Sequence, residues 1–178
     1  DEPVHVLETD SRDSFIEEWN KIGSWDGEDV TVSLVVINMH GSPEVLTPHP
    51  NRDTGCISAE DVDNGTLISK NIGDMLILGC NSGHFDHRYS SIANRFLVNN
   101  NVNSVIASDG TVTSRSVFGN YKSKGNPSFV KYLWSAHKYR DNFGFIQYTK
   151  NEKGELEYSI IGKKVSAKSI FKALGKDV

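Results

Sequence analysis

Apolar residues gather along the chain in short runs whose spacing switches between that of strands and that of helices. The longest strand-like run is Val30–Ile37, which is rich in β-branched residues and becomes continuously apolar. Such a run is typical of a strand that is covered on both faces, so we expect a central strand of a sheet there. Two further buried-strand patterns follow at Met75–Cys80 and Ser104–Ser108.

Two segments outside these runs have helical spacing. Capping residues at Thr9–Ser11 introduce a helix through Ser14–Trp19 that stops by Gly23, and a second helix is expected from about Ser90. The apolar positions that share a helix face are Phe15, Ile16 and Trp19 in the first and Ile92, Ala93, Phe96 and Leu97 in the second. The alternation of strand, helix and strand, with long crossovers, predicts an α/β fold with parallel strands and helices on both faces of the sheet.

The remaining segments complete this prediction. A first strand is expected at Val4–Leu7. The segment Gly41–Asn64 holds three prolines and no sustained periodicity, so we expect a loop with at most a short strand or hairpin. Towards the carboxyl end the pattern predicts a helix near Ser128–Tyr139, an antiparallel hairpin formed by Phe143–Thr149 and Leu156–Ile161, and a short helix at Ser166–Leu174.

Length and composition narrow the class of protein. A chain of 178 residues suits one domain spanning residues 1–178, because domains cluster near roughly 100–150 residues. The formal net charge of −4 argues against nucleic acid or an anionic membrane as an obligatory partner, and no apolar run approaches the roughly 20 residues of a membrane span. The chain begins without methionine or a signal-peptide core, so we expect a soluble domain cut from a larger protein.

The candidate chemistry lies where two of the predicted strands end. His40 closes the first apolar strand and is followed by Gly41, and Cys80 closes the second. Ligands of open α/β sheets bind at the carboxyl ends of parallel strands, so the two side chains are expected to face each other across a cleft. Histidine is suited to proton exchange with a cysteine nucleophile, and the N–H groups of Gly41 and Cys80 are candidates for an oxyanion hole.

The residues around this pair resemble a known group of enzymes. An apolar strand before His40-Gly41 and another before Gly79-Cys80-Asn81-Ser82-Gly83 are similar to the two signature blocks of clan CD cysteine peptidases, which include caspases, gingipains and separases. The second block is especially similar to that of the CHAT branch of caspase-like domains. Together with SIANRF and IASDGTV, the segments INMHGSP and LGCNSGHFDH resemble caspase-like domains at the carboxyl ends of bacterial Rhs-type polymorphic toxins. The resemblance covers roughly Val30–Val112.

The resemblance implies a fold and a reaction. The fold would be a caspase-like three-layer sandwich with a mostly parallel central sheet and the hairpin at its carboxyl end. Cys80 would attack a peptide carbonyl, and His40 would protonate the leaving amine and then activate water. No cofactor or metal is implied. The domain would be a secreted or delivered bacterial effector, or would process the chain that contains it. The Gln-Ala-Cys-x-Gly signature of the best-known caspases is missing, so a preference for aspartate is not carried over.

Residues near the dyad are candidates for contact with the substrate. They are Asn81, Ser82, His84 and Asp86 after the cysteine, and Ser108 and Asp109 after the next strand. An acidic Asp109 facing the pocket would suit a basic substrate residue, although Asp109-Gly110 is equally well explained as a turn.

Several alternatives remain open at this stage. A third catalytic residue among Asp53, Asp86 and Asp109 is not identified. The same cleft would also serve a catalytically silent module that holds a peptide or partner domain. The triplet His84, Asp86 and His87 offers metal ligands but lacks helical ligand spacing, and the lysines near the end form either an anion site or a solvated face. Cys56 is interpreted as a bystander thiol.

Overall fold

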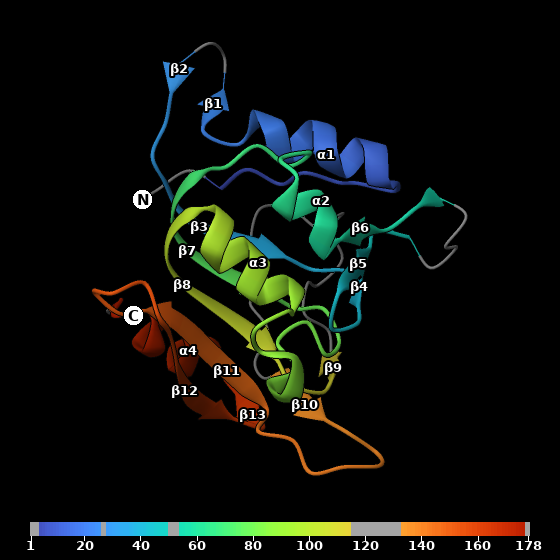
Figure 1. Cartoon of the computed structure of the whole chain (residues 1–178), viewed down its shortest axis with the longest axis vertical. Coiled ribbons are helices and arrows are strands. Elements are labelled where there is room, and N and C mark those ends of the chain that lie inside the picture. The colour runs from blue at the N-terminus through green and yellow to red at the C-terminus, as the bar shows by residue number, and fades with distance from the viewer. Residues whose placement is uncertain (1–3, 26–27, 50–53, 115–132, 177–178) are drawn as a thin grey trace, which may run out of the picture.

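The structure is a computed structural model of the chain, and it describes residues 4–25, 28–49, 54–114 and 133–176. A five-stranded sheet forms its centre, with the strand order β12-β11-β8-β7-β3 (Figure 1). The strands are β3 (Val32–Ile37), β7 (Asn71–Ile77), β8 (Asn101–Ser108), β11 (Phe145–Lys150) and β12 (Leu156–Gly162). The pairings of β3 with β7 and of β7 with β8 are parallel, whereas those of β8 with β11 and of β11 with β12 are antiparallel.

Helices cover both faces of this sheet. They are α1 (Arg12–Lys21), α2 (Ala59–Asp63), α3 (Ile92–Asn99) and α4 (Ala167–Ala173), with a short 3₁₀ turn η2 (Phe85–His87). One buried apolar cluster joins α1, α2 and α3 to one face, and a second joins α4 to the other. Trp19 packs against Phe96 at 5.0 Å between ring centroids, which ties α1 to α3. The general α/β class is confirmed, and so are the two amphipathic helices and the carboxyl-terminal hairpin.

Three smaller sheets surround the central one. They are β1 (Ser24–Trp25) with β2 (Glu28–Asp29), β4 (His40–Gly41) with β5 (Val45–Thr47) and β6 (Ile57–Ser58), and β9 (Thr111–Ser114) with β10 (Leu133–Ala136) and β13 (Lys164–Val165). The short strands β4, β5 and β6 lie within the segment expected to be mainly loop. They bring the residues after β3 back beside the carboxyl ends of the parallel strands.

Three expectations about elements are wrong. The strand β3 lies at the edge of the central sheet and not in its middle. Only Ile37 of this strand is buried and Val36 is 46% exposed, because one side of an edge strand has no neighbour in the sheet. Val4–Leu7 forms no strand, and Val4 and Val6 are largely exposed. Residues 133–136 form a strand where a helix was expected, because Leu133 and Ser135 are buried in alternation; the first part of that predicted helix, 128–132, lies outside the described residues.

The central sheet is also less parallel than the sequence suggested, since half of its pairings are antiparallel. Four of its strands nevertheless point the same way, and the parallel trio β3, β7 and β8 directs its carboxyl ends towards β4 and β9. Among the described residues, none of the helices is long and apolar enough to span a membrane.

Candidate active site

The two predicted signature blocks leave the central sheet side by side. Ile37 and Ile77 are register partners in the parallel pair of β3 and β7, and the Leu78 N–H donates to the Ile37 carbonyl at 2.8 Å. His40 and Cys80 each follow three residues after this shared rung. Neither belongs to the strand that precedes it, because His40 opens β4 and Cys80 lies in a turn. The sequence therefore placed both at the correct edge of the sheet.

A glycine contact brings the two blocks together. A β-carbon at Gly41 would lie 3.0 Å from the carbonyl oxygen of Cys80 and 3.0 Å from the α-carbon of Gly79. Contacts this short are unfavourable for any larger residue, so glycine allows the backbone of the histidine block to rest directly on that of the cysteine block. Gly79 is itself packed against Leu46 of β5 and leaves no room for a side chain.

Two backbone donors at this contact have no acceptor among the residues that the structure describes. The Ser42 N–H donates to Val45, so the adjacent rung of Gly41 and Leu46 is a non-hydrogen-bonded pair, and the Gly41 N–H turns away from β5. Within the described part of the chain, no carbonyl or side chain accepts from the Cys80 N–H. Both groups predicted to form an oxyanion hole are thus available at the place where the two blocks meet.

The segment that follows β8 holds the cysteine turn from the other side. The Asn81 N–H donates to Gly110 at 2.8 Å, and the Gly83 N–H donates to Ser108 at 2.9 Å. The Val112 N–H, from β9, points at the sulfur of Cys80 at 3.4 Å. Asn81 adopts a left-handed backbone conformation with φ of 54°. Non-glycine residues rarely take this conformation, and they do so mostly in tight turns and at functional sites.

His40 stands on the exposed side of the small sheet. It is the register partner of Thr47 in β5, whose hydroxyl lies 3.5 Å from the sulfur of Cys56. Because side chains opposite each other in a sheet share a face, His40, Thr47 and Cys56 form a row. Cys56 is two strand spacings, about 10 Å, from His40, which is too far for direct proton exchange. The prediction that Cys56 is a bystander is consistent with this geometry.

Among the described residues, no carboxylate is bonded to His40. Of the three candidates for a third catalytic residue, Asp53 lies outside the described residues and Asp86 is exposed, with its N–H donating to Nδ1 of His84. Asp109 is bonded to other groups. The imidazole therefore has no acidic partner within this part of the structure.

Two of the predicted substrate contacts are internal. Ser82 and Ser108 are fully buried, and their hydroxyls bond to Gly79 and to Ser135 at 2.8 Å and 2.6 Å. These serines shape the turns beside Cys80. Asn81 is half-buried. Its side-chain oxygen is buried and has no hydrogen-bond partner among the described residues.

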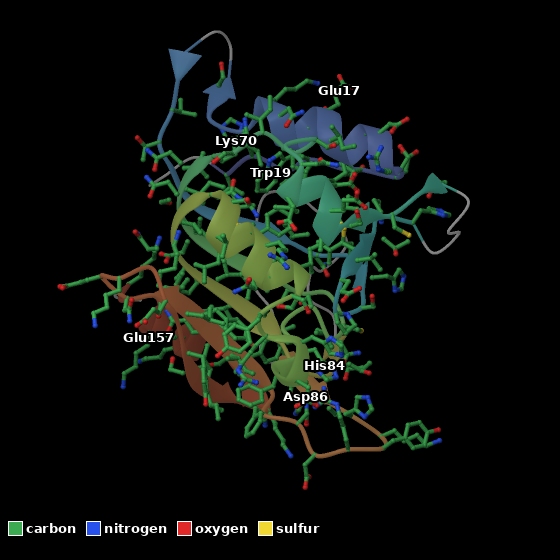
Figure 2. All side chains as sticks on the ribbon, viewed as in Figure 1. Glu17, Trp19, Lys70, His84, Asp86 and Glu157 are labelled. Carbon is green, nitrogen blue, oxygen red and sulfur yellow. The ribbon has the colours of Figure 1, made fainter. Side chains whose placement is uncertain are left out.

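His84 and Asp86 lie in the turn after the cysteine, and Figure 2 shows them at the opposite end of the molecule from Lys70. Burial lowers the pKa of His84, and the positive charge of Arg140 lowers it further. His84 and His87 meet edge to face at 4.9 Å between ring centroids. No three His, Cys, Asp or Glu side chains of the described residues are grouped so that they could hold a metal ion.

Asp109 is the best-connected side chain near the site. It is fully buried and accepts hydrogen bonds from Arg140 at 2.8 Å and 3.2 Å, from the Phe85 N–H at 2.8 Å and from the Phe143 N–H at 2.9 Å. Burial acts to raise the pKa of Asp109, but the hydrogen bonds from Arg140 and the two backbone groups outweigh it, so the pKa is lowered. Its carboxylate is thus engaged within the chain and does not line an open pocket.

Arg140 is the residue near the site that sequence reasoning missed. It lies in the loop between β10 and β11, directly after the segment Ser128–Tyr139 that was expected to be helical, and it reaches Asp109 from 31 positions away. The sequence carries no local signal for such a pair. Next to it, Phe85 packs edge to face on Phe143 and Tyr158, and the guanidinium of Arg88 lies over its ring.

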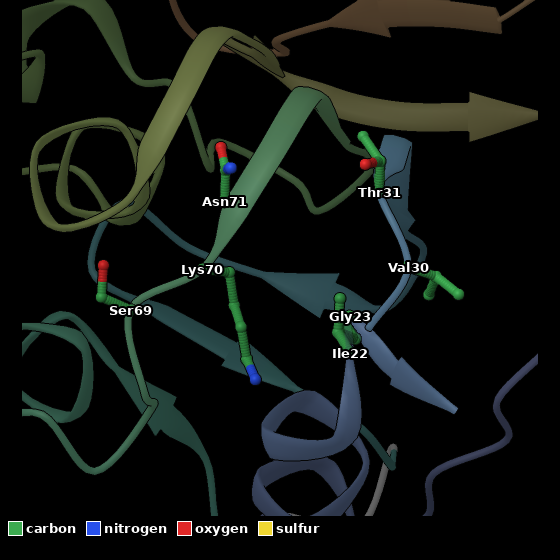
Figure 3. A pocket seen from close by; sticks show the side chains of 7 residues that line it. All are labelled: Ile22, Gly23, Val30, Thr31, Ser69, Lys70 and Asn71. Atoms are coloured by element: carbon green, nitrogen blue, oxygen red, sulfur yellow. The ribbon is translucent and has the colours of Figure 1, made fainter. Parts of the chain in front are cut away.

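A separate pocket of about 390 Å³ opens near the amino ends of β3 and β7, the opposite edge of the sheet from Cys80. Figure 3 shows its lining, which is Ile22, Gly23, Val30, Thr31, Ser69, Lys70 and Asn71. Burial lowers the pKa of Lys70, and its ammonium group donates to the Asn20 carbonyl at the end of α1. The lysine thus stabilises a helix terminus, and the pocket lacks a second charged group.

Comparison of the chain with protein-family models, with curated proteins and with solved structures finds no match. The assignment of a function therefore depends on the residues and on the geometry described above.

Proposed function

We propose that this chain is a caspase-like cysteine peptidase domain in which Cys80 is the nucleophile and His40 carries the proton. The observation that supports the proposal best is the meeting of two sequence blocks. His40-Gly41 and Gly79-Cys80 leave neighbouring parallel strands at the same rung and come into backbone contact through Gly41. This edge of an α/β sheet is where ligand sites form.

The proposed reaction uses the thiol of Cys80, the imidazole of His40 and two backbone N–H groups. The sulfur of Cys80 forms a bond to the carbonyl carbon of a peptide, and the developing oxyanion accepts from the N–H groups of Gly41 and Cys80. The C–N bond then breaks as the proton from the thiol, carried by His40, passes to the leaving amine. Water, deprotonated by His40, hydrolyses the thioester, which releases a carboxylate and regenerates the thiol. The Val112 N–H points at the sulfur and fixes its position in the turn.

The substrate is a peptide segment, either in a target protein or in a longer chain that contains this domain. The wider biological role that we propose, a delivered bacterial effector or an autoprocessing domain, rests on the resemblance of Val30–Val112 to the caspase-like domains of Rhs-type toxins. His40 lacks a carboxylate partner among the described residues, which suits a histidine that serves the leaving group.

The test is cleavage of a peptide library by the purified chain. Cys80→Ala and His40→Ala should each lower the cleavage rate about 10³-fold or more, because removal of either partner disables the pair. Cys56→Ala is the matched control, since it removes the other thiol and should leave the rate unchanged. Circular dichroism would establish that each variant is folded. Wild-type cleavage by a folded Cys80→Ala variant would overturn the proposal, and a chain that binds peptides but cuts none would favour the silent module.

A further inference from the structure

We infer that Asp109 and Arg140 are positioning residues for the proposed nucleophile, a role that rests on the proposed function of Cys80. The carboxylate of Asp109 joins three separate segments of the chain. It accepts from Arg140 in the loop before β11, from the Phe143 N–H near the end of that loop, and from the Phe85 N–H in the turn after Cys80. One carboxylate therefore holds these three segments together.

The pair acts on Cys80 through the backbone that flanks Asp109. On one side of it, Ser108 accepts from the Gly83 N–H, and on the other, Gly110 accepts from the Asn81 N–H. Val112, two residues further, directs its N–H at the cysteine sulfur. The cysteine turn is therefore bonded to three alternate residues of one segment, 108, 110 and 112, and Asp109 fixes the position of this segment. A shift of residues 108–112 would therefore move the Val112 N–H away from the Cys80 sulfur.

An ion pair suits this task because of its geometry. Arg140 grips Asp109 with both terminal nitrogens, at 2.8 Å and 3.2 Å, so the planar guanidinium fixes the orientation of the carboxylate. The carboxylate is completely buried while the Arg140 side chain is 24% exposed. Arg140 bonds to Asp109 and to the Asp141 carbonyl, so we assign it a role through Asp109 and none in the reaction itself.

The chain contains a matched pair at a distance from Cys80. Arg12 of α1 bonds to Asp61 of α2 at 2.6 Å, and Asp61 is also nearly buried. Asp61 accepts from the backbone and hydroxyl of Ser58, much as Asp109 accepts from Phe85 and Phe143. Removal of Arg12 should therefore disturb stability in a similar way without altering the surroundings of the proposed nucleophile.

The experiment compares the alkylation rates of the two thiols in the full chain. Iodoacetamide modifies Cys80 and Cys56, and mass spectrometry of their peptides gives a separate rate for each. The Val112 N–H fixes the position of the sulfur, so loss of this contact moves the sulfur and slows the reaction at Cys80. We expect Arg140→Met to lower the Cys80 rate about tenfold, since small misplacements of reacting groups have effects of this size or larger. The Cys56 rate should not change.

Three further variants complete the design. Arg140→Lys keeps the charge but loses the two-nitrogen grip on the carboxylate, so it should restore only part of the Cys80 rate. Asp109→Asn should behave like Arg140→Met. Arg12→Met should leave the Cys80 rate at the wild-type value although it lowers the unfolding midpoint. The Cys80 rate itself is the readout for this variant, because the Arg12 side chain packs on Gly55 next to Cys56. A purely structural loss would instead raise both rates together, as unfolding exposes both thiols.

The outcomes separate this inference from the proposed function. If wild-type Cys80 reacts faster than Cys56 and Arg140→Met retains that ratio, the positioning role is overturned while the nucleophile stands. If wild-type Cys80 reacts no faster than Cys56, the proposed nucleophile fails and the positioning role fails with it. An equally lowered Cys80 rate in Arg140→Met and in Arg12→Met would also overturn the specific role of Arg140.

Discussion

Asn81 combines backbone strain with an unused hydrogen-bonding group next to Cys80. Its φ of 54° is a conformation that costs most residues about 1–2 kcal/mol and glycine almost nothing. Asn81→Gly should therefore stay within about 1 kcal/mol of wild-type stability, because relief of strain offsets the greater freedom of the unfolded glycine. Asn81→Val should lose about 2 kcal/mol, since branched residues tolerate this region least. Denaturant unfolding of both variants measures the difference.

The Asn81→Gly variant also tests whether the Asn81 side chain contacts the substrate. Asn81 is half-buried, and its side-chain oxygen finds no partner within the described chain, so a rotation of the side chain would let this oxygen accept from the N–H of a bound peptide without breaking an internal hydrogen bond of that oxygen. Asn81→Gly removes that oxygen without unfolding the site, and we expect kcat/KM for peptide cleavage to fall about tenfold, the worth of one good hydrogen bond. A wild-type kcat/KM in this variant would exclude Asn81 from the predicted substrate contacts.

Two helices whose pattern lies within a short segment were predicted correctly, whereas a strand that depends on pairing with distant segments was not. The helices α1 and α3 were predicted with their buried faces because the apolar residues within each segment repeat at helical spacing. These residues include Phe15 and Trp19 in α1 and Phe96 in α3. The strand β10 was missed because it lacks a contiguous apolar run and is stabilised by pairing with β9 and β13, which are distant in sequence. Strand order leaves no local trace either, so the edge position of β3 could not be deduced from its apolar composition.

The edge position of β3 makes its spacing from β7 important for the site, because β3 leads into His40. A β-carbon at Gly73 in β7 would fall on the carbonyl oxygen of Ser33 in β3. Gly73→Ala should therefore push the two strands apart and lower the free energy of unfolding by about 2–3 kcal/mol, as overpacking does elsewhere. Denaturant unfolding measures this loss. Labelling of Cys80 should slow as well, because the histidine and cysteine blocks no longer meet at the same rung.

Val36→Ala is the control for this spacing. Val36 lies on the same strand but is 46% exposed, so its truncation changes a side chain and leaves the backbone distance between β3 and β7 intact. We expect a loss within about 0.5–1 kcal/mol and an unchanged rate at Cys80. Equal effects of the two substitutions would contradict the importance of the backbone contact at Gly73.

At the scale of the whole molecule, the candidate site divides into a part that the sequence contains and a part that folding creates. His40, Gly41, Gly79 and Cys80 were predicted from short blocks, because strand ends and glycines are visible in a single sequence. The ion pair of Arg140 with Asp109 was not predicted, because these two residues come together only when β11 pairs antiparallel with β8. The correct edge of the sheet was predictable, and the internal charge pair was not.

The buried acids also set how the stability of the molecule depends on pH. For Asp61, as for Asp109, burial tends to raise the pKa, but hydrogen bonds from an arginine and from backbone groups lower it overall. A carboxyl group whose folded pKa is lowered contributes stability above its unfolded pKa near 3.9, and this contribution is lost as the pH falls through the folded value. The lowered pKa of His84 acts in the same direction from about pH 6.5 downwards, because the unfolded imidazole takes up a proton first.

We therefore expect the free energy of unfolding to fall as the pH is lowered from about 7 to 3. Asp61→Asn isolates one contribution, because the amide keeps the shape of the side chain but cannot ionise. This variant should be less stable than wild type near neutral pH by about 1 kcal/mol, because the Arg12 side chain is 34% exposed and water screens the loss of its partner. The two stability curves should converge at low pH, where the wild-type carboxyl is also neutral. Curves that stay parallel over this range in urea unfolding would show that the charge of Asp61 does not stabilise the contact between α1 and α2.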